Sequence, residues 1–91
     1  MEIYSKNQQI IDGELDGNQV MMHIEKEKYF GLTPVGKRIW DLVEQPRSFD
    51  EIMNALLSEY DVAKDQCEKE VQLFLDKAVQ YNIIIKSEQH P

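Results

Sequence analysis

The spacing of apolar residues changes near residue 33, and this change limits the folds open to the chain. From residue 8 to residue 32, short apolar runs are separated by turn signals at Asp12-Gly13, at Asp16-Gly17 and at residues 25–28. The run at residues 20–24 alternates in the way that is typical of a strand with one buried face. The region therefore predicts a three-stranded antiparallel meander.

After residue 33 the apolar residues recur at helical spacing in three successive segments. Thr33 is expected to cap the first helix, with proline at the next position, and Ser48 with Glu51 forms a capping box for the second. A third helix is expected from residue 63 or 64 to about residue 81, followed by a short returning strand or extended segment at residues 83–85.

This order predicts an α+β fold, a winged helix-turn-helix in which a three-stranded antiparallel sheet precedes three helices. The 91 residues leave room for one core, so we expect a single domain at residues 1–86 and a flexible C-terminal tail at residues 87–91. The longest uninterrupted apolar run is residues 83–85, too short to cross a bilayer, and the start of the chain is unlike a signal peptide. A cytoplasmic location is expected.

No residue pattern indicates catalysis, a cofactor or a metal site. The single cysteine, Cys67, lies in a helical pattern without other ligands at metal-binding spacing, so it is expected to be packed rather than reactive. His23 and His90 are far apart in the sequence and in different contexts. No combination of nucleophile and base with a supporting motif is present, and we expect a protein that is not an enzyme.

The net charge of −7 repels phosphate backbones and anionic membranes and favours basic partners, although acidic residues also keep small domains soluble. In a DNA-binding helix-turn-helix the third helix would enter the major groove. Here that helix carries more acidic than basic residues: Asp65, Glu68, Glu70 and Asp76 against Lys64, Lys69 and Lys77. We expect no nucleic acid and no membrane among the partners.

The remaining possibility is a peptide site at an exposed strand edge. The third strand of the meander, with Tyr29, Phe30, Gly31 and Leu32, combines aromatic side chains with a glycine that allows another backbone to approach. One of the two aromatic residues is expected in the core, because adjacent strand residues point to opposite faces. The alternative is an adaptor that docks a folded protein through the second and third helices.

Several stretches of the sequence resemble the PqqD-like family. The most specific is the stretch Gly31-Leu32-Thr33-Pro34-Val35-Gly36 with the following Ile39-Trp40, and the likeness extends through residues 48–52 to residues 71–84. The resemblance implies a recognition element that binds the leader segment of a ribosomally made precursor peptide and presents it to a maturation enzyme. Where the family usually has asparagine before the proline, this chain has Thr33, which caps a helix equally well.

In that family the leader adds as a strand beside the third strand, in a groove walled by the third helix. Carried onto this chain, the resemblance implies these peptide-binding residues: Lys28, Tyr29, Phe30, Gly31 and Leu32 on the strand, and Cys67, Glu68, Val71 and Leu75 on the helix.

The chain looks most like the stand-alone recognition protein of lasso-peptide pathways, whose usual partner is a separate leader peptidase. The recognition protein of the quinone-cofactor (PQQ) pathway is the alternative. An exposed edge strand could also pair with its copy in a second molecule, so a monomer or a weak homodimer is expected.

Overall fold

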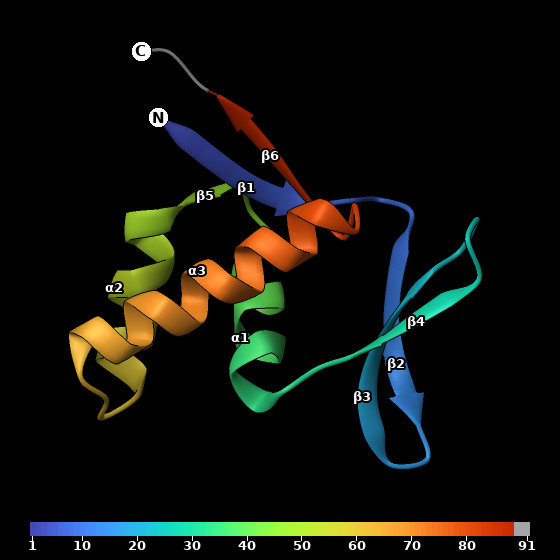
Figure 1. Cartoon of the computed structure of the whole chain (residues 1–91), viewed down its shortest axis with the longest axis horizontal. Coiled ribbons are helices and arrows are strands. Elements are labelled where there is room, and N and C mark those ends of the chain that lie inside the picture. The colour runs from blue at the N-terminus through green and yellow to red at the C-terminus, as the bar shows by residue number, and fades with distance from the viewer. Residues whose placement is uncertain (89–91) are drawn as a thin grey trace.

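The computed structural model describes residues 1–88, which form two small antiparallel sheets and three helices (Figure 1). The meander is at one side of the molecule and the second sheet lies above the helices, with α3 crossing in front of α1 and α2 in the view of Figure 1. The elements are β1 (Glu2–Lys6), β2 (Ile10–Leu15), β3 (Asn18–His23), β4 (Lys28–Gly31), α1 (Pro34–Leu42), β5 (Arg47–Ser48), α2 (Phe49–Glu59), α3 (Lys64–Gln80) and β6 (Ile84–Glu88).

The expected meander is present, with strand order β2-β3-β4. Its first hairpin turns at Asp16 and Gly17, which both have positive φ (53° and 82°), as a two-residue type I′ turn requires. The other turn signal, Asp12-Gly13, lies inside β2 and is not a turn. Asp12 and Gly13 pair with Met21 and Val20 of β3, so the hairpin is longer than the turn signals predicted.

A second sheet, with order β5-β1-β6, was not expected, and the prediction of a single three-stranded sheet is corrected accordingly. It joins residues from both ends of the chain, since Ile3 pairs with Ser48 of β5 and with Ser87 of β6. The tail predicted to begin at residue 87 is wrong for Ser87 and Glu88, because backbone pairing with β1 holds them in β6. Residues 89–91 of that predicted tail lie outside the described residues.

Local side-chain hydrogen bonds set the helix starts, as predicted. The Thr33 hydroxyl accepts a hydrogen bond from the Gly36 N–H at 3.0 Å. The Ser48 hydroxyl accepts from the Glu51 N–H at 3.2 Å, and the Glu51 carboxylate accepts from the Ser48 N–H at 3.1 Å. These hydrogen bonds satisfy backbone donors that have no partner within the helix. The capping box also lowers the pKa of Glu51, because its backbone and hydroxyl contacts with Ser48 favour the charged form.

The core lies where the three helices meet. It is built from one face of each helix together with residues of β1, β2, β3 and β6, and its largest fully buried members are Trp40, Met21, Ile39, Ile52, Leu56, Leu75, Ile84, Val43 and Val71. Gly36 allows α1 to lie close to α3, because a Cβ at this position would stand 2.9 Å from Cε2 of Phe74. The helices therefore seat the Phe74 ring directly beside the start of α1.

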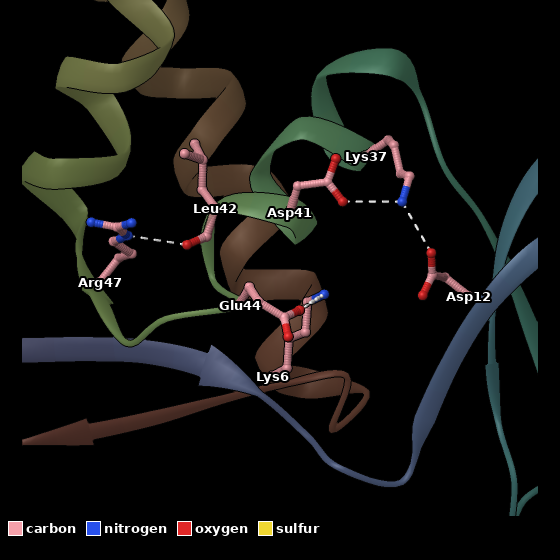
Figure 2. Close-up of polar contacts among 7 residues, drawn as sticks. All are labelled: Lys6, Asp12, Lys37, Asp41, Leu42, Glu44 and Arg47. Atoms are coloured by element: carbon pink, nitrogen blue, oxygen red, sulfur yellow. Dashed lines mark hydrogen bonds and ion pairs between the residues drawn. The ribbon is translucent and has the colours of Figure 1, made fainter.

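Polar contacts connect α1 to the strands on either side of it (Figure 2). Lys37 bridges Asp12 of β2 and Asp41 of its own helix, both at 3.0 Å. The contact with Lys37 lowers the pKa of Asp12. Lys6 at the end of β1 pairs at 2.5 Å with Glu44, which lies just after the end of α1. These ion pairs hold the meander and β1 against the same helix.

The segment between α1 and α2 is also fastened to α1. Arg47 in β5 donates from its Nε to the carbonyl oxygen of Leu42 at 3.2 Å, as Figure 2 shows. This bond satisfies one of the last carbonyls of α1, which have no partner within the helix.

Candidate functional site

The meander has two free edges, and they differ in charge. β3 is the central strand, so β2 and β4 each have one side without a strand partner among residues 1–88. The β2 edge carries Asp12 and Glu14, whereas β4 after Lys28 consists of Tyr29, Phe30 and Gly31. Charged residues on an edge strand hinder the addition of another strand. The edge of β4 is therefore the more receptive of the two.

The strand register determines which amides of β4 are free. The Leu32 N–H donates to the Gln19 carbonyl of β3 at 3.0 Å. From this pair back to Lys28, each residue of β4 stands opposite one residue of β3 without a bulge. In such a pair, hydrogen-bonded and non-bonded residue pairs alternate. Phe30 therefore bonds inward to β3 like Leu32, while the N–H and C=O groups of Tyr29 and Gly31 point to the open edge.

A groove separates this open edge from α3. It consists of two adjoining hollows of about 530 and 150 Å³ that share Gly31, Phe74 and Lys77. The larger hollow extends toward the start of α1 and the smaller one toward the end of α3. The residues that line one or both hollows on α3 and directly after it are Glu70, Leu73, Phe74, Lys77, Ala78 and Tyr81.

Aromatic side chains close the groove at the end of α3. The rings of Phe30 and Tyr81 have their centroids 5.4 Å apart and are tilted by 39°, so β4 and the helix end are in direct contact there. Leu73 is 59% exposed and Phe74 is half-buried, which leaves apolar surface open along the groove. Glu70 and Lys77 border the same groove with opposite charges.

The strand residues that the sequence predicted all belong to the edge, but they do not share one role. Phe30 and Gly31 line the groove itself. Tyr29 is 58% exposed, and its side chain lies on the opposite face of the sheet from Phe30. Lys28 is exposed at the start of β4, and Leu32 is half-buried directly after it. Of the two aromatic residues, Phe30 is half-buried against the core and Tyr29 is open, so the two point to opposite faces as expected.

The helix residues that the sequence predicted do not line the groove. Cys67, Val71 and Leu75 are buried in the core, and Glu68 borders a separate shallow hollow with Asp65, Lys69 and Gln72. The groove face of α3 is offset by one residue, so that Phe74 takes the position expected of Leu75. One residue is a rotation of about 100° around a helix. The sequence signal that could have identified the groove face is the presence of apolar residues outside the main apolar stripe of α3. Leu73 is the clearest of them.

Within residues 1–88, no group of three or more His, Cys, Asp or Glu side chains could hold a metal ion. Burial raises the pKa of the Cys67 thiol, which keeps it protonated near neutral pH. None of the described helices is long and apolar enough to span a membrane.

Comparison with known proteins places these features in a family. No curated protein matches the sequence. The structure of TbiB1 in complex with the TbiA(beta) leader peptide has 29% sequence identity and a TM-score of 0.75, covering 88% of this chain and 93% of TbiB1. A lasso peptide synthetase B1 complexed with its leader peptide shares the fold, with a TM-score of 0.75 at 16% identity, over 90% of this chain and 96% of the other. The family model for coenzyme PQQ synthesis protein D matches residues 18–84, more than half of the chain. The chain therefore belongs to the PqqD family.

Proposed function

We propose that this protein is a non-catalytic recognition element that binds the leader segment of a ribosomally made precursor peptide as an added strand on β4. The observation that carries the proposal is the uncharged open edge at Tyr29 and Gly31, which runs beside an apolar groove. The similarity to TbiB1, whose structure contains a leader peptide, supports the same conclusion over nearly the whole chain.

Backbone pairing provides the affinity in this mechanism. Tyr29 and Gly31 each offer one N–H and one C=O, which allows up to four main-chain hydrogen bonds with an added strand. At a net value of about 0.5–1.5 kcal/mol for each bond, the edge contributes roughly 2–6 kcal/mol before the loss of peptide entropy.

Side-chain pockets provide the specificity. Alternate residues of an added strand point to the same face of the sheet, so every second leader residue would project toward the groove. The open apolar surface of Leu73 and Phe74 suits aliphatic or aromatic leader residues there. Glu70 and Lys77 add charged contacts of both signs at the groove margin.

We further propose that the pathway is lasso-peptide maturation and that the protein presents the leader to a leader peptidase. The shared fold of a lasso peptide synthetase B1, whose structure contains the leader peptide, supports this pathway, and PQQ formation, which the family model names, is the alternative. The meander beside the three helices would then act as a winged helix-turn-helix adapted to peptide rather than to DNA.

Proline substitution tests the strand-addition mechanism at chosen amides. Gly31→Pro removes an outward N–H and should lower the affinity for a fluorescently labelled leader, measured by anisotropy, by about tenfold or more. The matched control is Glu14→Pro, which removes an amide that points outward from the other edge of the same sheet. The Ile24 N–H donates to the Gln9 carbonyl, so in the β2–β3 register the odd-numbered residues of β2 bond to β3 and the amide of Glu14 faces away from it. This control should leave the leader affinity unchanged.

Both variants should remain folded, because neither amide is needed by β3, and circular dichroism checks this. Proline at Phe30 or Leu32 would instead break the hairpin itself. Equal leader binding by Gly31→Pro and the unmodified chain would contradict strand addition on β4. The alternative of an adaptor for a folded protein, docked through α2 and α3, would then be favoured.

A further inference from the structure

The second sheet also ends in an open edge, which is β6. In the strand order β5-β1-β6, the outer side of β6 has no strand partner among residues 1–88, and Figure 1 shows this strand at the margin of the molecule. The Asn7 N–H donates to the Ile83 carbonyl at 3.1 Å, and β1 and β6 stay in register from there to Glu88. Hydrogen-bonded and non-bonded pairs alternate along such a ladder, so the N–H and C=O groups of Lys86 and Glu88 point to the open side.

The charges on this edge differ from those on the open edge of β2. β2 carries Asp12 and Glu14, so two copies of that edge would repel each other. On β6, Lys86 and Glu88 are exposed and have opposite charges. Charged residues keep most strands away from an edge, but a strand with the reverse order of charges meets them favourably. β6 itself has that order when it runs antiparallel to its own copy.

The row of charges next to this edge is acidic. Glu2 of β1 stands directly opposite Glu88 of β6, and like charges opposite one another destabilise a sheet. Within the chain, Lys86 pairs with Glu2 at 3.3 Å and the Met1 ammonium pairs with Glu88 at 2.8 Å. The two carboxylates remain about half exposed, with 51% of the Glu2 side chain and 53% of the Glu88 side chain open to solvent. A basic residue on the outer side of Glu88 would therefore extend the row with the favourable sign.

One antiparallel register of two β6 strands matches these charges. Hydrogen bonds form where the outward amides of both strands meet, which puts the two-fold axis at a residue. With the axis at Ser87, Lys86 stands opposite Glu88 of the second copy, and this pair occurs twice. An axis at Lys86 or at Glu88 would place two like charges opposite each other. An axis at Ile85 would bring Asn82, in the turn after α3, opposite Glu88 of the second copy, where the end of the helix crowds the edge.

We propose that this protein forms a homodimer in which β6 pairs antiparallel with β6 of a second copy, with the two-fold axis at Ser87. The second sheets of the two copies then join into one, in the order β5-β1-β6-β6-β1-β5. The net charge of −7 on each copy and the short contact make the dimer weak. β4 belongs to the other sheet, so the dimer leaves both β4 edges open and does not depend on the proposed leader-binding function.

Charge reversal on β6 tests the proposal. Lys86→Glu leaves two acidic residues on the edge and Glu88→Lys leaves two basic ones, so each variant alone faces like charges in its own dimer. An equimolar mixture restores both opposite pairs, because the acidic edge of one variant meets the basic edge of the other. Lys28→Glu is the control, since it makes the same charge change as Lys86→Glu at an exposed position on β4. Self-association is measured by sedimentation over a concentration series, and circular dichroism checks the fold.

We expect the unmodified chain and Lys28→Glu to self-associate equally, and each single β6 variant to self-associate about tenfold or more weakly. The mixture of Lys86→Glu and Glu88→Lys should associate as a heterodimer with roughly the strength of the unmodified dimer. An unmodified chain that sediments as a monomer at every concentration would overturn the proposal, and so would a mixture of folded variants that stays monomeric. Loss of self-association in Lys28→Glu with retention in Lys86→Glu would overturn it in favour of pairing through β4.

Discussion

The close approach of Gly36 to Phe74 makes Gly36→Ala a test of how the groove is built. An added Cβ would stand 2.9 Å from Cε2 and 3.3 Å from Cδ2 of the Phe74 ring. Ordinary contact begins at about 3.4 Å, so one of the two groups must move by roughly half an ångström. The ring lies beside open groove on its other side, whereas α1 is fixed by its buried residues, so the ring is expected to move.

Two opposing effects set the change in stability. Alanine in place of glycine favours a helix by up to about 1 kcal/mol, and less near the helix start. Overpacking costs about 1–3 kcal/mol when the surroundings are rigid, and less when a ring can swing into open space. We therefore expect Gly36→Ala to destabilise the protein by about 0–2 kcal/mol. We also expect it to weaken leader binding by a larger factor than this loss of stability implies, because the displaced Phe74 ring narrows the groove.

A double-mutant cycle with Phe74→Leu separates these effects. Urea unfolding gives the free energy of unfolding, and anisotropy with a labelled leader gives the affinity. The smaller leucine relieves the contact, so the penalty of Gly36→Ala on leader binding should shrink in the Phe74→Leu background. Additive effects of the two substitutions on leader binding would refute the reasoning that Gly36 acts through the Phe74 ring.

Three further outcomes follow from single contacts. Ser48→Ala should lower the free energy of unfolding by about 1 kcal/mol in urea titration, because it removes the cap that Glu51 completes; an unchanged midpoint would show the box to be dispensable. Asp12→Asn should cost roughly 0.5 kcal/mol near neutral pH through the exposed contact with Lys37. Since folding lowers the pKa of Asp12 from its ordinary 3.8, the difference in stability between the two proteins should vanish as the pH falls below 3.8 and through the pKa of Asp12 in the folded protein. A difference in stability that persists at pH 2 would contradict this expectation. Cys67 should react with iodoacetamide only as the protein unfolds, and rapid alkylation of the folded protein would show that the thiol is accessible.

Short-range signals were the most reliable guide to the fold. The caps at Thr33 and Ser48 involve residues three apart, so the sequence alone contains all the groups that form them. The Asp16-Gly17 turn is equally local. By contrast, β1 and β5 were not predicted, because their pairing brings residue 3 together with residues 48 and 87. Lys86, Ser87 and Glu88 of β6 are exposed and polar, and they gave no sign that the partner of this strand lies at the start of the chain.

The groove borders the strand on which the sequence predicted a site, but it borders a different face of α3 from the one predicted. The open edge at residues 29–31 follows from strand order and composition, both of which a sequence displays. The face of α3 that borders the groove depends on how the helix is rotated against α1 and α2, and the core takes the strongest apolar stripe, which includes Val71 and Leu75. A binding groove on a small domain must then use the apolar residues that the core leaves over, here Leu73 and Phe74.

The position of the meander determines whether these leftover residues form a groove at all. Among the strands of residues 1–88, β4 is bonded to β3 alone, so its distance from α3 depends on inner-face contacts such as Phe30 with Tyr81 and on the Lys37–Asp12 ion pair at the other edge. A peptide that inserts between β4 and α3 bonds to the strand and packs on the helix at the same time. Binding should therefore stabilise the seating of the meander, because the added strand increases the contact between β4 and α3.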